Sequence, residues 1–234
     1  MKKTINYFTP AEWILWLSSL ILITLSFLIF DGESIISFVA SLLGSTALIF
    51  CAKGNPIGQI IVIIFSLLYA YISYSFAYYG EMITYLGMSG PMAVYAFIAW
   101  IRNPYNGNHS EVKINRLTRR EYIFMAILSV FVTVIFYFIL KHFGTANLLP
   151  STVSVTTSFI AVYLTARRSP LYAIAYAAND VVLIVLWLLA SISDRSYVSV
   201  LVCFIVFLAN DIYGYLNWHR MEKSQSKASI SQTN

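Results

Sequence analysis

Two Asn-Asp dipeptides stand inside long apolar runs near the end of the chain. Asn179-Asp180 lies in the penultimate run and Asn210-Asp211 in the last. Each run can cross a bilayer, which takes about 20 residues of helix. An Asp near the centre of a membrane helix costs on the order of 2.5–3.5 kcal/mol on insertion scales. We therefore expect that a chain with two such carboxylates uses them, and that they belong to a polar interior.

Other polar and aromatic residues have the spacing to face the same interior. Gln59, Ser66 and Tyr69 are seven and three residues apart, so they share one face of a helix. Trp187 follows Asp180 by seven residues and lies on the same face as that carboxylate. The residues that we predict to bind substrate are Gln59, Ser66, Tyr69, Tyr95, Asn179, Asp180, Trp187, Asn210, Asp211 and Tyr213.

Carboxylates and aromatic rings together indicate a site for an organic cation. Each ring face attracts positive charge by about 0.5–2 kcal/mol, and asparagine and tyrosine side chains can bind hydroxyl groups. A planar cationic ring that carries a sugar or an alcohol arm would contact all of these groups. Structural roles are the alternative: tyrosine and tryptophan pack between helices, asparagine bonds one helix to another, and Asp211 could pair with Arg220 near the cytoplasm.

The composition places these runs in a membrane. Of the 234 residues, 59% are apolar and only 11% are charged, against about 25% charged residues in a soluble domain. The net charge of +5 is interpreted as a topology signal, and no nucleic-acid partner is expected. Cys51 and Cys203 lie in or beside apolar runs, which is typical of small core residues and not of a disulfide framework.

The motifs of nucleotide hydrolysis, dinucleotide binding and zinc binding are not in the sequence. His109, His142 and His219 fall in loops on different sides of the membrane, so we expect no metal and no cofactor. Two membrane aspartates can share a proton as an acid–base pair, which makes an intramembrane aspartyl enzyme the alternative from another class. The Tyr-Asp and Gly-x-Gly-Asp motifs of such enzymes are missing, and a close approach of the two carboxylates would restore this alternative. We expect a protein that is not an enzyme.

Eight apolar runs predict eight membrane-spanning helices. The first follows Thr9 with a capping box and a proline at the first helical position. Pro91, in the middle of the fourth, is expected to kink it. The predicted spans are Glu12–Phe30, Ser34–Cys51, Pro56–Phe76, Glu81–Ile101, Glu121–Lys141, Pro150–Ala166, Leu171–Ala190 and Tyr197–Leu216.

The positive charges predict the orientation of these spans. With the amino terminus in the cytoplasm, Lys2 and Lys3 lie inside, and of the fifteen Lys and Arg residues only Lys141 and Arg195 lie outside. The positive-inside rule therefore predicts that both termini are cytoplasmic. The acidic residues of the outer loops are Asp31, Glu33, Glu81 and Asp194.

A faint internal repeat predicts how the helices are grouped. Pro56 and Pro170 open equivalent helices 114 residues apart, and Tyr95 matches Tyr213 at an offset of 118, as do the tryptophans five residues after each. Like-oriented repeats are a transporter architecture, with the substrate at their interface. The predicted domains are an N-terminal helix (1–33), a first three-helix repeat (34–102), a basic loop and linker helix (103–145), a second three-helix repeat (146–220) and a disordered tail (221–234).

Three segments resemble the PnuC family of vitamin transporters. They are Asn210–Trp218, with its Ile-Tyr-Gly-aromatic pattern, its echo Val94–Trp100, and Ala52–Gln59. The resemblance covers roughly residues 34–220. It implies an all-α, SWEET-like bundle of 3+1+3 helices with one additional N-terminal helix, in a bacterial cytoplasmic (inner) membrane. It also implies uptake of nicotinamide riboside for NAD biosynthesis by facilitated diffusion, with phosphorylation in the cytoplasm trapping the vitamin.

One feature departs from that family. The Trp-x-x-Trp-x-x-x-Asn pattern at the start of the seventh span is missing, and Tyr172 and Tyr176 stand in that region instead. Relatives of this fold carry thiamine, which is also a cation, or riboflavin, which is neutral. The acidic pair disfavours riboflavin and leaves nicotinamide riboside and thiamine open. The expected partners are the cationic vitamin and the lipid bilayer, while proton coupling and a homo-oligomer are left open.

Overall fold

The computed structural model describes residues 7–75, 79–145 and 147–231. Within these ranges lie eight helices that are long and apolar enough to cross a membrane, as the sequence predicts. Lys2, Lys3 and the predicted helix end at Phe76 lie outside the described residues. The spans are α2 (Pro10–Phe30), α3 (Ile35–Ala52), α4 (Ile57–Ser75), the interrupted span Tyr79–Ile101, α7 (Arg119–His142), α8 (Leu148–Ala166), α9 (Tyr172–Ser193) and α10 (Val198–Ser231).

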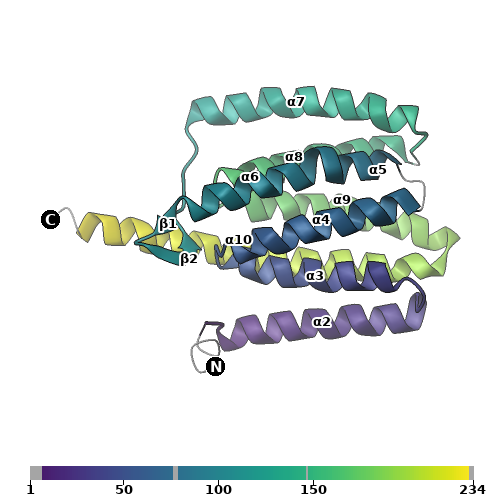
Figure 1. The fold of residues 1–234 in the computed structure, drawn as a ribbon, viewed down its shortest axis with the longest axis horizontal. Coiled ribbons are helices and arrows are strands. Elements are labelled where there is room, and N and C mark those ends of the chain that lie inside the picture. Colours follow the sequence, from purple (N-terminus) through teal and green to yellow (C-terminus); the bar gives the residue numbers. More distant parts are fainter. Residues whose placement is uncertain (1–6, 76–78, 146, 232–234) are drawn as a thin grey trace.

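Six helices close a ring. α3 packs on α4 and α10, α9 packs on α8 and α10, and α6 (Gly90–Ile101) joins α4 to α8. α2 lies against α3 and α10, and α7 lies against α8, so these two form the outermost layers in Figure 1. α2 begins and α10 ends at the same end of the bundle (Figure 1), which we call the terminal end.

The fourth span is interrupted just before its proline. α5 (Tyr79–Thr84) passes into a π-helical turn, η1 (Tyr85–Ser89), and then into α6. Pro91 has no backbone N–H, and its ring crowds the preceding turn. The chain accommodates it with a wider turn, in which the Gly90 N–H donates to the Tyr85 carbonyl. The irregularity predicted at Pro91 is therefore a π-bulge.

The turns after α3 and after α8 are built alike. Gly54 and Arg168 both have positive φ, at 67° and 58°. The next residue in each turn, Asn55 or Ser169, accepts a backbone N–H through its side-chain oxygen from the residue two positions later. These four residues pair at the offset of 114 that the repeat predicts. The match supports the repeat, whose wider extent stays a prediction.

A short antiparallel hairpin adds strands that the all-α prediction did not include. β1 (Pro104–Tyr105) pairs with β2 (Asn108–Val112). The turn between them is Asn106-Gly107, and both residues have positive φ. An Asn-Gly pair in this conformation matches the twist of two hairpin strands.

The segment from the end of β2 to Asn115 connects the turns after α3 and after α8. The Val112 N–H donates to the Gly54 carbonyl, and the Asn115 N–H donates to the Arg168 carbonyl. One short segment therefore binds both of these similarly built turns.

α10 continues past the predicted end of its span. Its 34 residues give a length of about 51 Å at 1.5 Å per residue, well beyond the hydrocarbon thickness of about 30 Å. The prediction of a disordered tail after residue 220 is wrong over the described part of that segment. The extension is held because Gln225 Oε1 accepts the Ile114 N–H at 2.9 Å and Arg116 pairs with Glu222.

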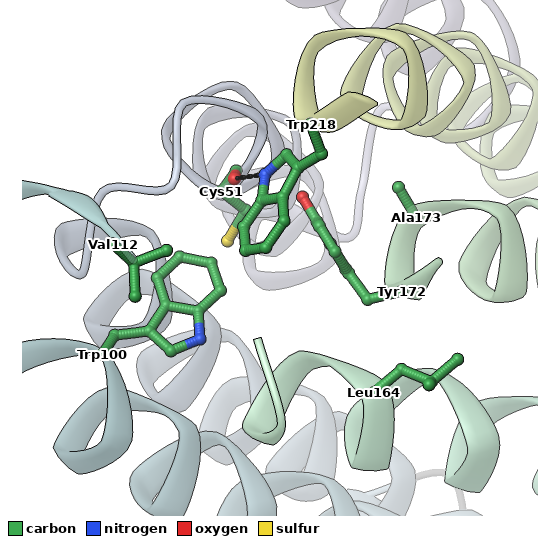
Figure 2. Close-up of a cluster of buried hydrophobic side chains, with 7 residues drawn as sticks. All are labelled: Cys51, Trp100, Val112, Leu164, Tyr172, Ala173 and Trp218. Carbon is green, nitrogen blue, oxygen red and sulfur yellow. Dashed lines mark hydrogen bonds between the residues drawn. The ribbon is translucent and has the colours of Figure 1, made fainter. Parts of the chain in front are cut away.

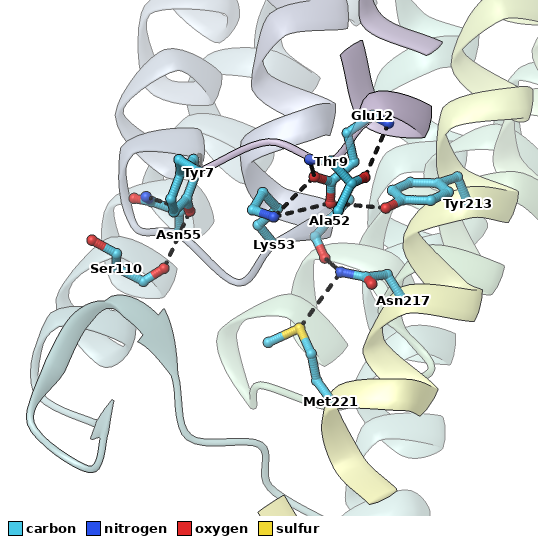
Figure 3. Close-up of polar contacts among 10 residues, drawn as sticks. All are labelled: Tyr7, Thr9, Glu12, Ala52, Lys53, Asn55, Ser110, Tyr213, Asn217 and Met221. Carbon is cyan, nitrogen blue, oxygen red and sulfur yellow. Dashed lines mark hydrogen bonds and ion pairs between the residues drawn. The ribbon is translucent and has the colours of Figure 1, made fainter. Parts of the chain in front are cut away.

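A buried ion pair holds α2 to the ring (Figure 3). Glu12 is 1% exposed and closes the predicted capping box with Thr9. Its carboxylate accepts from Lys53 Nζ at 3.0 Å and from the Tyr213 hydroxyl at 2.8 Å. Because both charges are satisfied by partners, this carboxylate is part of the scaffold.

We expect Lys53→Met to destabilise the fold, because it leaves the Glu12 carboxylate buried without its cation. Removing one partner of a buried pair costs about 3–5 kcal/mol, and the melting temperature should fall by roughly 6–20 °C. The measurement is thermal unfolding in detergent. Lys113→Met, at an exposed lysine, is the control and should melt like the wild type. Equal melting of the two variants would contradict the structural role of the pair.

Candidate functional site

The ring of helices surrounds a cavity of about 180 Å³. Asp180 lines it from α9 and Asp211 from α10, and both residues are 4% exposed. The described residues that line the cavity include no Lys, Arg or His. The polar interior inferred from the two Asn-Asp dipeptides is therefore a cavity beside two carboxyl groups, and the described part of its wall carries no basic residue.

The two carboxyl groups lie next to each other. Asp180 and Asp211 are within side-chain hydrogen-bonding reach, so the alternative pairing of Asp211 with Arg220 is not the contact observed. Asp180 Oδ2 has no hydrogen-bond partner among the described residues. Two carboxylates this close repel unless a proton is shared between them or a cation lies beside them. The pair can therefore receive a positively charged ligand.

Seven of the ten predicted residues line the cavity. The shared helix face predicted for α4 is present, and the face predicted for α9 holds both its carboxylate and its tryptophan. These residues are Gln59, Ser66, Tyr69, Asn179, Asp180, Trp187 and Asp211. Their position meets the requirement for binding, and binding itself stays a prediction.

The other three predicted residues lie away from the cavity. Tyr95 has 52% of its surface exposed. Asn210 points to α2, where its Nδ2 donates to Ser19 Oγ at 2.9 Å, and Tyr213 bonds Glu12 on the same helix. Adjacent residues of a helix point about 100° apart, so Asp211 faces the cavity while Asn210 attaches α2.

Asn179 is oriented by α8. Its Oδ1 accepts from Ser154 Oγ at 3.1 Å and from Thr157 Oγ1 at 2.8 Å. Since these hydroxyls donate to Oδ1 of Asn179, its Nδ2 amino group is the part of the side chain that remains to donate to a ligand. Ser154 lines the cavity as well, so its hydroxyl and the Asn179 amide stand together on the wall, and Asn179 directly precedes Asp180 in the sequence.

Much of the wall is aromatic and was not predicted from the sequence. Tyr85 of the π-helical turn, and Tyr172 and Tyr176 of α9, line the cavity together with Phe65, Phe204 and Phe207. The tyrosines of α9 precede Asp180 by eight and four residues, which places all three on one helix face. That spacing could have identified them. Tyr85 gave no such signal, because a π-bulge changes the rotation of the helix beyond it.

A cluster of buried rings closes the cavity at the terminal end (Figure 2). Trp100, Trp218 and Tyr172 are 1%, 0% and 2% exposed and pack with Cys51. Tyr172 and Cys51 also line the cavity, so the cluster forms its floor. Trp218 Nε1 donates to the Cys51 carbonyl and Trp100 Nε1 donates to the Thr165 carbonyl, both at 2.9 Å. The third helix of each predicted triplet thus binds the last turn of the first helix of the other.

The comparisons with known proteins agree with one another. Residues 34–220 match the model of a family described as Nicotinamide mononucleotide transporter. A nicotinamide riboside transporter PnuC of Neisseria mucosa is 29% identical over 215 residues, which cover 90% of this chain and 82% of the relative. A protein of the same name from Haemophilus influenzae is 20% identical over 223 residues, 95% of each chain. A crystal structure of the vitamin B3 transporter PnuC aligns with a TM-score of 0.80 and 27% identity, over 93% of this chain and 94% of the other.

We expect Gly44→Ala to narrow the cavity without unfolding the protein. A Cβ at Gly44 would stand 2.5 Å from Cζ of Phe207 and 3.1 Å from Cε2 of Phe65. Both rings line the cavity, so the nearer ring must move. Calorimetric titration with nicotinamide riboside should show an affinity about tenfold lower, with a melting temperature close to that of the wild type.

The matched control is Gly214→Ala, also inside a helix. There the nearest atom would be the Ala173 Cβ at 3.5 Å, an ordinary contact, and affinity should be unchanged. Equal affinities of the two variants would show that the Phe207 ring does not limit access to the cavity.

Proposed function

The chain belongs to the nicotinamide mononucleotide transporter family, and from that premise we propose that it carries nicotinamide riboside across the membrane by facilitated diffusion. The family resemblance stated from the sequence is confirmed, and so is the expectation of a transporter that is not an enzyme. The close approach of Asp180 and Asp211 is the geometry that an aspartyl enzyme would need. In a chain of this family we assign the pair to substrate binding.

The observation that carries the proposal is a carboxyl pair on a cavity wall that has no basic residue among its described members. Nicotinamide riboside is a planar cationic ring that carries a ribose. The carboxyl groups of Asp180 and Asp211 would balance the charge of the ring, and the aromatic wall would hold its faces. The Asn179 amide and the Ser154 hydroxyl would bind the ribose hydroxyls.

We place the terminal end in the cytoplasm of a bacterial cell. The turns at that end carry Lys53, Arg102 and Arg167, whereas Asp31 and Asp194 lie in turns at the opposite end. The positive-inside rule supports this orientation. With both termini inside, the floor of buried rings closes the cavity toward the cytoplasm. Uptake then requires the two triplets to rock about the site, and phosphorylation inside the cell would trap the vitamin.

Thiamine is the second candidate substrate, because it is also an aromatic cation. The observation that supports thiamine is the pair Tyr172 and Tyr176, which replace the family's tryptophan pattern in this sequence. The names of both relatives favour nicotinamide riboside. Competition binding of the two vitamins to the purified protein distinguishes them, and stronger binding of thiamine would transfer the proposal to that substrate.

In proteoliposomes we expect uptake of nicotinamide riboside that needs neither ATP nor an ion gradient. Asp180→Asn should lower the affinity at least about tenfold, since it removes a buried charge that faces the ligand. Asp194→Asn, at an exposed turn on the opposite end from the floor, is the control and should transport normally. Undiminished transport by Asp180→Asn would remove this carboxylate from the site, and uptake that follows an imposed pH gradient would indicate proton coupling instead of facilitated diffusion.

A further inference from the structure

The cavity has a third carboxylate, at the end away from its floor. Glu81 lies in the first turn of α5 and lines the cavity. The sequence analysis placed it in an outer loop, with no role in the site. Thr145 and Ser151, which follow α7 and begin α8, line the cavity too, so this end is bordered by polar groups.

Glu81 lies farther from the floor than the two aspartates. It is the third residue of α5, which begins at the end of the bundle opposite the floor. Asp180 follows Tyr172 of the floor by eight residues, and Asp211 precedes Trp218 of the floor by seven. A positive ligand that moves from Glu81 toward the floor meets the Asp180–Asp211 pair and, among the described lining residues, no basic side chain.

Two tyrosine rings line the cavity together with Glu81 and Asp180. The rings of Tyr69 and Tyr85 have centroids 4.9 Å apart and planes inclined by 41°, and both line the cavity. Tyr85 follows Glu81 by four residues, about one helical turn. Ring faces attract cations and bind planar aromatic groups. The segment from Glu81 to Asp180 thus offers the same two kinds of contact as the site below it.

The packing of α5 fixes where Glu81 stands. A Cβ on Gly80 would meet Leu140 Cδ2 at 2.6 Å and Thr145 Oγ1 at 2.9 Å. The absence of a side chain at Gly80 therefore allows α5 to approach the end of α7 closely. This contact positions the carboxylate of the next residue, Glu81, which lines the cavity together with Leu140.

We propose that Glu81 is a cation-binding group at the end of the cavity opposite its floor, where a positively charged aromatic substrate is held before it moves to the Asp180–Asp211 pair. The inference rests on the proposed function, since it concerns the path by which the cationic vitamin reaches the site. Its basis in geometry is the unpartnered Asp180 Oδ2, the ring pair of Tyr69 and Tyr85 and the carboxylate that lines the same cavity at the end away from the floor.

The test is transport of nicotinamide riboside by the full chain in proteoliposomes, oriented for uptake. Glu81→Gln keeps the size of the side chain and removes its charge, and we expect KM to rise about five- to tenfold with the maximal rate retained. Glu81→Asp keeps the charge and should stay within about twofold of the wild type. Glu33→Gln is the matched control, because it removes an exposed carboxylate from the same end of the bundle without touching the cavity, and its KM should be unchanged.

Three results would overturn the inference. One is a wild-type KM for Glu81→Gln. Another is an equal rise for Glu81→Gln and Glu81→Asp, which would assign the effect to packing and not to charge. The third is an equal rise for Glu33→Gln, which would assign it to surface potential. If the unmodified protein does not carry nicotinamide riboside, the proposed function fails, and this outcome is seen before any variant is compared.

Discussion

An unbalanced carboxylate is among the most costly groups to bury in a bilayer, and the fold treats its buried carboxylates in two different ways. Glu12 is surrounded by its own partners, with Lys53 supplying the cation and Tyr213 a hydroxyl. Asp180 and Asp211 lie next to each other on the cavity wall, and the described part of that wall carries no cationic side chain. The charge of Glu12 is balanced by Lys53, and the contact attaches α2. The Asp180–Asp211 pair has no cationic side chain beside it among the described residues, which is the arrangement expected of a binding site and not of a structural contact.

The helices around the cavity are joined across the bundle at the terminal end. There the turns at Gly54 and Arg168 are bound by one short segment, and the indoles of Trp100 and Trp218 bind carbonyls of α8 and α3. Away from that end, the wall is made of ring faces and short hydroxyl side chains.

The sequence was sufficient for the number of spans and for most of the wall, because a membrane helix is long, apolar and periodic. Spacing along one helix identified the face of Gln59, and the cost of a buried charge identified Asp180. Neither argument predicts which other helix packs against a given helix face. Asn210 and Tyr213 were misplaced because α2, which repeats nothing in the rest of the chain, covers that side of α10. Disorder was predicted after residue 220 from composition alone, and composition does not reveal that Gln225 has partners in a loop more than a hundred residues earlier.

The crossed indole bonds at the floor carry a consequence for how this end of the molecule opens. One bond links α6 to α8 and the other links α10 to α3, and both indoles lie in the same cluster of rings. Because the two bonds join different pairs of helices within one cluster, the floor opens only when both of them break. Loss of a single bond leaves the other to hold the floor closed.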